Sequence, residues 1–491
     1  MVHPTPTKVL LTTTLRPLVA QLSGSLAPGV RLLEQFLHNE PTPQKMAEFE
    51  RELSTLLREV GRRILVWLLN HLEPEDAVAA PSRVRFEGRL YRRRGKQHNV
   101  WATLFGPVDV WRRLYEPLEH GVRSIHPLEL QLGVEAGVAT PAFAERVGQC
   151  AANHTQHEVL AMLERDHNVH WSSTSLRKVL TSLSAGMAKH RHLSQVEQVV
   201  RWLEQARASQ GRYRPTLSVG RDGIFVPLQH RVWQEGATAT VSVLDRRGKR
   251  VGTVYLGHMP EPGQGTVTAQ LSALLHDILR QVDSHRLRLV YVTDDGYHPS
   301  DYYQSVLQKM PDPRRPWGRL DWLRIIDYYH ACQYVQQLAD VIFDPGTESQ
   351  GWAKRMREQL KTKAHGVARV LQSASALRRQ RGLRGQAKLY AQAYAYLHKR
   401  SQWMRYQSYR KQHLPIGSGI TEAAGKIVFT QRLKRSGMAW TITGGQVILD
   451  LRVIWLSGVW DEVYQRYLAS KPQPATRVDM AKGTQRGQQA A

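Results

Sequence analysis

The order of apolar runs between residues 215 and 340 limits the fold of this chain more than any other feature of its sequence. Three strand-like runs come first, in PTLSVGRDGIFVPLQ and in ATVSVLDRRGKRVGTVYLG, which is divided by the turn Arg247–Lys249. A helical pattern over Leu271–Leu279, the apolar run LRLVYVTDDG, a second helical pattern over Tyr302–Met310 and the run LRIIDYY follow. Three strands followed by helix, strand, helix, strand predict a mixed sheet with helical crossovers.

Helical and strand-like regions precede this sheet. Residues 46–72 keep a helical apolar period, and short alternating runs between Val84 and Tyr115 predict a small β region with turns at Gly95-Lys96 and Gly106-Pro107. Three successive helices are expected between Thr140 and Met187, and Leu193–Ala208 is expected to be a connecting helix. This order resembles a helix-turn-helix DNA reader, although a small helical bundle gives a similar pattern.

Charge is distributed unevenly along the chain. The 491 residues include 68 Lys and Arg against 42 Asp and Glu, a net charge of +26, and 42% of the residues are hydrophobic. Between Trp352 and His413 sixteen basic residues accompany one acid, Glu358. A solvated basic face is one interpretation, but a surplus this large favours a surface for a polyanion, and nucleic acid is the first candidate.

Other features exclude several classes of protein. No apolar run of about 18 residues or more is present to span a bilayer, and the N-terminus is a poor secretory signal. Two distant cysteines, Cys150 and Cys332, form neither a disulfide framework nor a zinc motif. We therefore expect a soluble, cytosolic protein that binds anions.

The domain prediction follows from these patterns. It comprises an N-terminal helical region (1–80), a small β-hairpin region (81–125), a helical DNA-binding region (126–208), a first part of the α/β core (209–345), a basic helical insertion (346–413), C-terminal core helices (414–470) and a disordered tail (471–491).

Three acids in this order could perform metal-dependent chemistry. Asp222 and Asp294 are expected at the ends of strands, and Glu422 is expected in the first turn of a helix that begins near Gly419. At that position a glutamate could simply cap the helix. If the three converge, their mutual repulsion is relieved by Mg²⁺ or Mn²⁺, and a pair of such ions supports in-line phosphoryl displacement.

A family resemblance rests on several longer segments. They are GRDGIFVPL, TATVSVLDRRGKRVGTVYLGHMPE, YVTDDGYHPSDYYQSVL, IIDYYHACQYVQQLADVIF and GSGITEAAGKIVFTQRLKRSGMAW. In these the chain resembles bacterial insertion-sequence transposases of the DDE, ribonuclease-H-like class, most of all the ISKra-type group. The resemblance implies a ribonuclease-H-like sheet with a helical insertion, two divalent ions, and cutting and joining of DNA at element ends.

The resemblance also implies roles for individual residues. Asp222, Asp294 and Glu422 match the three catalytic and metal-binding acids, and Asp295 replaces Asp294 if the second acid directly precedes Gly296. Asp327 and His330 would support the site or join strand to helix. Residues expected to contact DNA are Arg432, Lys434, Arg435, Trp403 (although helix packing is the favoured interpretation of this residue), Arg92, Arg93, Arg94, Arg177 and Lys178.

Three functions follow as hypotheses. The first is a transposase that acts on terminal inverted repeats and target DNA as a homo-oligomer. The second is a non-catalytic transposase relic that serves as a repressor or architectural protein. The third is a general nuclease of the same fold, which would cut without preferring particular ends.

Overall fold

The computed structural model describes residues 6–38, 40–73, 80–315, 317–383, 386–472 and 475–478. The chain divides into two compact units, which are treated separately below. Unit 1 comprises Met1–Leu183 with Tyr467–Ala491, and unit 2 comprises Ser184–Arg466.

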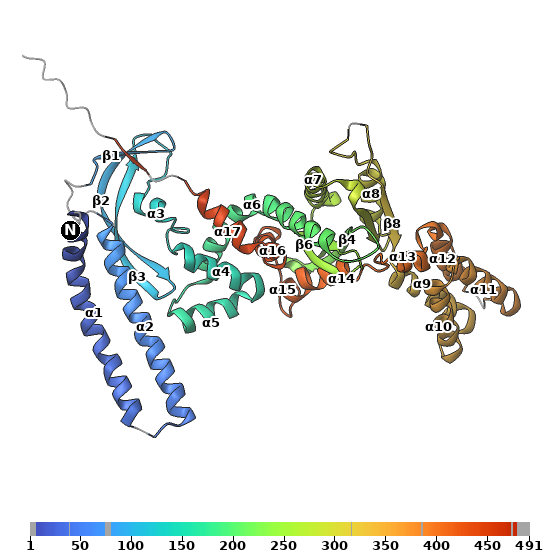
Figure 1. Ribbon diagram of the computed structural model, residues 1–491, viewed down its shortest axis with the longest axis horizontal. Helices are drawn as coiled ribbons and strands as arrows, with labels where there is room; N and C mark the ends of the chain where they lie inside the picture. Colours follow the sequence, from blue (N-terminus) through green and yellow to red (C-terminus); the bar gives the residue numbers. More distant parts are fainter. Residues whose placement is uncertain are drawn as a thin grey trace, which may run out of the picture. The chain divides into compact units, whose positions relative to one another are not determined.

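Unit 2 is built on a five-stranded mixed sheet. Its strands are β4 (Thr216–Pro227), β5 (Trp233–Leu244), β6 (Arg250–His258), β7 (Arg288–Thr293) and β8 (Trp322–Ile326), in the order β6-β5-β4-β7-β8 (Figure 1). The pairs β4–β5 and β5–β6 are antiparallel, and β4–β7 and β7–β8 are parallel. The predicted mixed α/β sheet is therefore present.

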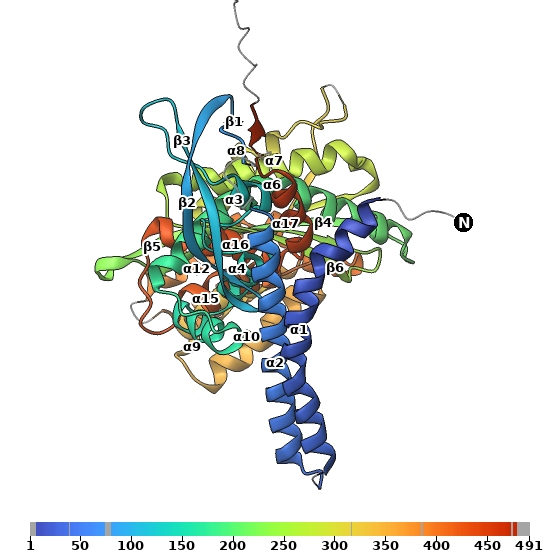
Figure 2. The ribbon, with the colours of Figure 1, turned by 90° about the vertical axis from the view of Figure 1, so that its left-hand side faces the viewer.

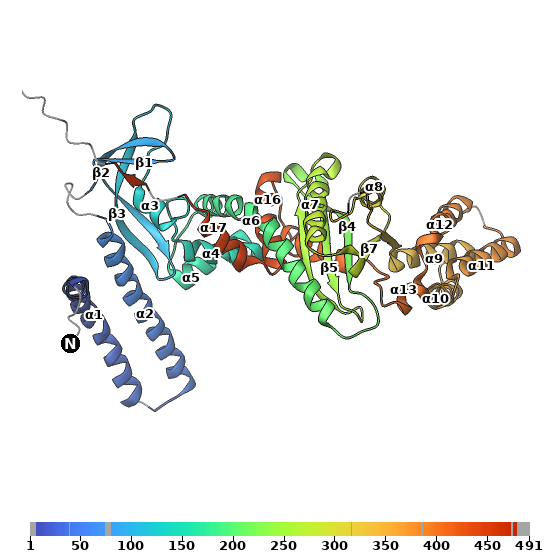
Figure 3. The same cartoon turned by 45° about the horizontal axis from the view of Figure 1, so that its top comes forward.

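Helices cover both faces of this sheet. On one face α6 (Ser173–Ala208), α7 (Gly265–Gln281) and α8 (Tyr297–Ser305) pack around a core that includes Leu203, Leu275 and Tyr302. On the other face, close approaches at Gly236 and Gly257 bring Phe429 and Leu449 against the sheet. These two residues belong to the π-helical segment η6 (Gly425–Thr430) and to α16 (Ile442–Leu456). Figure 3 shows α7 beside β5.

The predicted insertion is helical and has a core of its own. After α9 (Tyr328–Phe343) come α10 (Thr347–Thr362), α11 (Gly366–Arg381), α12 (Ala387–Lys399) and α13 (Tyr406–Lys411). Buried aromatic residues such as Trp352, Tyr390 and Tyr406 pack this core against β7 and β8. The chain then returns through α14 (Gly419–Ala424), η6 and α15 (Gln431–Leu433) to α16 and α17 (Trp460–Ala469).

Unit 1 combines a helical hairpin, a second sheet and a small helical group. The hairpin consists of α1 (Pro6–His38) and α2 (Pro43–His71), which lie side by side in Figure 2. The sheet has the order β3-β2-β1-β9, with β1 (Arg83–Phe86), β2 (Arg89–Thr103), β3 (Gly106–Pro117) and β9 (Thr476–Arg477). The group comprises α3 (Pro127–Leu132), α4 (Pro141–Asn153), α5 (Gln156–His167) and the first part of α6.

Capping explains the start of the helices in this group. Thr140 makes no side-chain capping bond to α4, which instead begins with Pro141 at its first position, and Thr155 forms a capping box with Glu158 at the start of α5. The predicted sequence of three helices is therefore confirmed. The predicted third helix and connecting helix are, however, a single helix of 36 residues, because nothing between Met187 and Leu193 interrupts the helical backbone.

Three further predictions were wrong in position. No turn occurs at Gly95-Lys96, since β2 continues through these residues with a bulge between Arg93 and Lys96. The helix expected over 302–310 begins at Tyr297. Within the tail predicted to be disordered, Thr476 and Arg477 pair with β1; the rest of that tail beyond residue 478, like residues 74–79 of the expected linker, lies outside the described residues.

Two other expectations concern helices and thiols. In the described part of the chain, no helix taken singly is both long and apolar enough to cross a membrane, although α16 and α17, bent by 117°, reach the threshold as a pair by length and composition. Cys150 and Cys332 are both free thiols.

Candidate active site

Asp222 and Asp294 reach the same edge of the sheet on neighbouring strands. The parallel pairing of β4 with β7 ends at Gly220 opposite Val292, and β4 then continues alone beside β5 through Asp222. Asp294 follows directly after β7. Because β4 and β7 are parallel, both acids lie where β7 leaves the sheet. Asp222 was expected at the end of its strand but lies within it.

Strand alternation assigns Asp222 and its neighbour to opposite faces. Arg221 is buried and donates from Nη1 to Thr268 Oγ1 at 2.7 Å and from Nη2 to Gln264 Oε1 at 3.0 Å, on the α7 side. Asp222 therefore points to the other side of the sheet, where α14 packs against β4 and β5. This is the side from which Glu422 approaches.

The helix carrying Glu422 is attached to the sheet through the preceding residue. Thr421 is buried, and its Oγ1 lies 3.0 Å from Oγ1 of Thr240 on β5. A Cβ on Gly220 would overlap that Thr421 hydroxyl, so glycine is required at this position for α14 to approach β4. Glu422 is thus held near the carboxylate edge by its neighbour in sequence.

Ser418, rather than Gly419, precedes the first helical residue of α14. Ser418 has no side-chain capping bond; its hydroxyl instead lies 2.9 Å from Glu422 Oε1 and also contacts the carboxylate of Asp327. Glu422 is one position further into the helix than the sequence suggested, and its carboxylate is bonded to a side chain rather than to the backbone. The capping role considered for this glutamate is therefore not the one that the structure shows.

A π-helical segment, Gly425–Thr430, follows α14 directly and begins three residues after Glu422. The carbonyl of Ile427 within it accepts a hydrogen bond of 2.6 Å from Nε of the buried Arg452 on α16. Single π turns inside α-helices are rare and are found frequently at functional sites. Here the segment also places Phe429 over Gly236 on β5.

The electrostatics of Asp222 show that the acids act on one another. The pKa of Asp222 is raised to about 7, first by burial and then by the neighbouring carboxylate of Asp294, with smaller contributions from Glu422 and Glu235. A hydrogen bond of 2.8 Å from the Gly223 amide to Asp222 Oδ1 opposes this shift. Repulsion between the carboxylates therefore helps to raise the pKa of Asp222.

Asp294 and Asp295 have different environments. Asp294 Oδ1 accepts a 3.0 Å hydrogen bond from the Gly296 amide. Asp295 instead has positive φ (71°), is largely buried, and forms ion pairs with both Arg324 and Arg400. Because Asp295 is already neutralised by two guanidinium groups, Asp294 is the acid available to the site.

The insertion contacts this same loop. Tyr396 on α12 donates its hydroxyl to the backbone carbonyl of Asp294 at 2.8 Å, and Arg400 at the end of α12 forms the ion pair with Asp295. One helix of the insertion therefore holds the backbone that presents Asp294. Arg400 belongs to the basic insertion, but its charge is paired with Asp295 and is therefore not available to bind a polyanion.

Asp327 connects two chain segments at this edge. Its side chain caps α9 by accepting from the Tyr329 amide at 2.6 Å, and it also accepts from the Ser418 amide at 3.1 Å and from the Ser418 hydroxyl. Partial burial raises the pKa of Glu422, and the nearby Asp327 carboxylate raises it further. Asp327 thus joins strand to helix and positions the turn before α14.

His330 packs among aromatic rings. Its ring lies 5.4 Å from that of Tyr334 and 5.6 Å from that of Tyr396, both approximately edge-on. It also lowers the pKa of Glu422 slightly. His330 therefore lies at the border of the site, in contact with the ring of Tyr396 and close enough to Glu422 to affect its pKa.

Glu235 is an additional acid that the sequence analysis missed. It lies at the start of β5, and a Cβ on Gly223 would overlap its carboxylate. Four exposed aromatic residues at this edge were missed as well: Phe225, Trp233, Tyr297 and Tyr329. These residues could have been predicted from the sequence, because they lie close to the strand ends that carry the acids.

The three basic residues after η6 have unequal exposure. Arg432 is only 2% exposed and its guanidinium lies over the ring of Trp440. Lys434 is half-buried over Trp233, and Arg435 is exposed. The prediction that Arg432 contacts phosphate is not compatible with this burial, whereas Lys434 and Arg435 lie at the surface.

Trp403 lies within the insertion core rather than at an open surface. The Arg324 guanidinium is 4.4 Å from its ring centre, and the ring lines a cavity of about 560 Å³. Other residues of that cavity come from the starts of β7 and β8, whereas the acids follow the ends of these strands. The packing role considered for Trp403 is the one that this environment favours.

The basic residues of unit 1 fall into two groups. Arg177 and Lys178 are exposed on α6 as expected, and Arg177 donates to Gln156 of α5 at 3.2 Å. Arg92, Arg93 and Arg94 lie within β2 and not at a hairpin tip. Arg92 and Arg94 are exposed and Arg93 is half-buried, and Arg94 is paired with Glu116 at 2.5 Å.

The acids suit a hard divalent cation in chemistry, but they are not arranged as a closed site. Within the described residues, no group of three or more His, Cys, Asp or Glu residues is placed so that it could hold a metal ion. Carboxylate oxygens are nevertheless the ligands that Mg²⁺ and Mn²⁺ prefer, and the raised pKa of Asp222 reflects a repulsion that a cation would relieve. Asp222 and Asp294 therefore fit such an ion, and Glu422 is bonded to Ser418 instead.

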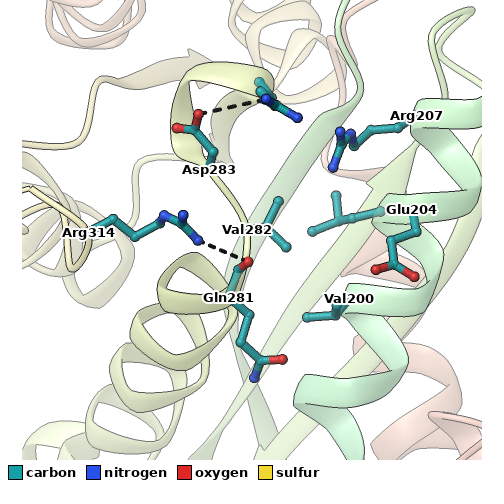
Figure 4. A pocket seen from close by; sticks show the side chains of 9 residues that line it. Val200, Glu204, Arg207, Gln281, Val282, Asp283 and Arg314 are labelled. Atoms are coloured by element: carbon teal, nitrogen blue, oxygen red, sulfur yellow. Dashed lines mark hydrogen bonds and ion pairs between the residues drawn. The ribbon is translucent and has the colours of Figure 1, made fainter.

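A smaller pocket lies at the opposite end of the sheet. It measures about 240 Å³ and is formed by α6, the end of α7 and the following loop (Figure 4). Its arginines include Arg286, which pairs with Asp283, and Arg314, which donates to the Gln281 carbonyl at 3.2 Å. Since Glu204 and Asp283 line the same pocket, its cationic charge is partly balanced.

Comparisons with known proteins give one finding of interest. No family model matches the chain. A protein of Streptococcus gallolyticus described as "UPF0236 protein in vanSb 3'region" is 23% identical over 460 residues, which cover 91% of this chain and 91% of that protein. The chain is therefore similar to that protein over nearly the whole length of both.

Proposed function

We propose that the chain is a DNA transposase of the DDE class that cleaves and joins strands at the ends of an insertion sequence. The observation that carries this proposal is the placement of three acids that are far apart in sequence: Asp222 and Asp294 lie at the same edge of the sheet, and the helix bearing Glu422 packs against that edge through Thr421. The strand order β6-β5-β4-β7-β8, with the last two strands parallel to β4, supports a ribonuclease-H-like assignment. The helical segment between β8 and α14 stands where the resembled family has its insertion.

Each acid would have a defined part in the reaction. Asp222, on the rigid β4, and Asp294, held by the Gly296 amide and by Tyr396, would hold divalent ions between them. When bound, such ions activate an attacking oxygen and stabilise a leaving one in phosphoryl displacement. Glu422, on the helix anchored by Thr421, would complete the ligand set after exchanging its hydrogen bond with Ser418.

The surroundings of the acids suit a nucleic acid. Phe225 and Trp233 are exposed on the β4–β5 hairpin, and Tyr297 and Tyr329 are exposed after β7 and β8. Exposed aromatic rings stack on bases, and nearby cations such as Lys434 and Arg435 neutralise phosphates. The excess of 68 basic over 42 acidic residues favours the same class of substrate.

The test is cleavage of DNA that carries the sequences flanking the coding region, with Mg²⁺ or Mn²⁺. Asp222→Asn, Asp294→Asn and Glu422→Gln should each reduce strand cleavage by about a hundredfold or more, because several kcal/mol of charge stabilisation is lost. Asp301→Asn, an exposed acid on α8, is the matched control and should retain activity. Metal titration calorimetry provides a second measurement, in which the first two variants should lose metal binding.

The outcomes separate the proposals. If the three acid variants cleave as well as the unmodified chain, the DDE assignment is wrong. If the unmodified chain binds DNA but neither cleaves it nor binds metal, the non-catalytic relic is the better description. Cleavage without preference for the flanking sequences would indicate a general nuclease instead.

A further inference from the structure

The α1–α2 hairpin of unit 1 exposes an extended apolar face. On α1 the exposed apolar residues are Leu15, Val19, Leu26, Val30, Leu33 and Leu37, and on α2 and its C-cap they are Met46, Leu57, Ile64, Leu68 and Leu72. Among the residues of α1 and α2 whose side chains are described, Leu18 and Leu69 are the only buried hydrophobic ones. A pair of long helices gains most of its stability from burying apolar faces; α2 buries one face against β3 through Leu69, whereas this second face is uncovered within the described residues.

The exposed residues of each helix form one stripe. At 3.6 residues per turn, the six residues on α1 fall within about 60° of arc, and Met46, Leu57, Ile64 and Leu68 on α2 fall within about 40°. These stripes are distinct from the residues that join the two helices. That contact uses Phe36 against Phe49, with ring centres 4.9 Å apart, and Gly29 against Leu56.

The two stripes lie on the same side of the hairpin. On each helix the exposed stripe is rotated by roughly 80° from the inter-helix contact, in the same sense along the chain. Because α1 and α2 run antiparallel, equal rotations in the same sense bring both stripes to one side. The result is one apolar face along the hairpin, interrupted on α2 by Glu50, which lies at the same helical angle as Leu68.

The size of this face is that of a stable interface. Eleven apolar side chains, each roughly half exposed, amount to on the order of 900 Å², which exceeds the ~300–600 Å² of the largest patch on a typical monomer. Each partner of a standard protein–protein interface contributes ~800 Å². The face is therefore large enough to hold a dimer by itself.

A second copy of the same hairpin is the partner that this face fits. A two-fold axis across the middle of α2 would pair two apolar faces of the same length and area, so that each covers the other.

We propose that two copies of this chain associate through the α1–α2 hairpins to form a four-helix bundle. In such a bundle the apolar face of each hairpin is buried against the apolar face of the other hairpin. The interface belongs to unit 1 and does not depend on the proposed chemistry of unit 2. It would hold two sets of acids in one assembly without DNA.

The first experiment measures the mass of the full chain without DNA, by light scattering after gel filtration. The unmodified chain should have the mass of two copies, and the double variant Leu26→Glu, Leu33→Glu should have the mass of one. Leu193→Glu, an equally exposed leucine on α6, is the control and should leave the dimer unchanged. A monomeric unmodified chain, or a double variant that keeps the mass of two copies, would overturn the proposal.

A second experiment does not require a destabilising change. In a chain with Cys150→Ser and Cys332→Ser, Leu57→Cys lies on the apolar face near the middle of α2, whereas Thr55→Cys lies on the opposite side of the helix. Oxidation should join Leu57→Cys chains into covalent dimers and leave Thr55→Cys chains separate. Equal cross-linking of the two variants, or none with Leu57→Cys, would contradict the proposed interface.

Discussion

The hydroxyl of Thr421 occupies the space that a side chain on Gly220 would need. This places α14 directly against β4, with the Thr421 hydroxyl 3.0 Å from that of Thr240. Gly220→Ala should therefore push α14 away from the sheet and lower the free energy of unfolding by about 1–3 kcal/mol, the usual cost of overpacking. Urea unfolding checks this value. Gly419→Ala, at a helical position with open space around its Cα, should be tolerated.

The raised pKa of Asp222 predicts how stability depends on pH. The ordinary pKa of an aspartate is 3.8 and that of folded Asp222 is about 7, so the folded chain binds an extra proton between these values. The free energy of unfolding should therefore fall as pH rises from about 4 to about 7, by up to about 4 kcal/mol. Asp222→Asn should remove this loss and be more stable than the unmodified chain at pH 8.

Added Mg²⁺ provides the complementary measurement. At pH 8 it should raise the melting temperature of the unmodified chain, because a cation relieves the repulsion at Asp222. The same addition should leave the melting temperature of Asp222→Asn nearly unchanged. An equal rise in both proteins would show that the ions bind elsewhere.

Asp294 and Asp295 should respond differently to the same substitution. Asp294→Asn removes a charge that repels Asp222, so it should leave stability equal or higher and abolish metal-dependent cleavage. Asp295→Asn leaves Arg324, which is 2% exposed, without its carboxylate partner, and should cost about 3–5 kcal/mol of stability. Thermal unfolding together with a cleavage assay at low temperature distinguishes the two. The reverse pattern would reassign the second acid to Asp295.

DNA binding should depend on exposed rather than buried cations. Replacing both Arg177 and Lys178 by alanine should weaken binding to any sequence and reduce the slope of log K against log salt by about one to two, because phosphate contacts are lost. Arg432→Ala should instead lower stability, since this guanidinium is buried over Trp440. Binding titrations at several salt concentrations, with unfolding curves for each variant, check both statements.

The sequence allowed the sheet to be predicted because its strands are apolar and follow a simple order. The runs containing Leu289–Val292 and Leu323–Ile326 are buried on both sides, and no other local structure suits them as well. The bulge in β2 was mistaken for a turn because Gly95 looks locally like a chain reversal, and the cross-strand partners Arg112 and Arg113 are distant in sequence.

The environments of single charged residues were the part that the sequence could not reveal. Arg432, Lys434 and Arg435 form one basic run, yet a π-helical turn just before them changes which side of the helix each residue occupies. The separate roles of Asp294 and Asp295 likewise depend on Arg324 and Arg400, which lie on other elements of the fold. Such distinctions arise from tertiary contacts and not from local pattern.

Unit 1 is closed by the last residues of the chain. Glu135 is buried and accepts 2.6 Å hydrogen bonds from the Tyr467 hydroxyl and from Lys471 Nζ, and β9 adds an edge strand beside β1. During synthesis, the first unit to begin leaving the ribosome is consequently the last to be completed. A chain that stops at residue 466 would contain the whole acid-bearing sheet, and its defect would appear instead among the earliest-made helices and strands.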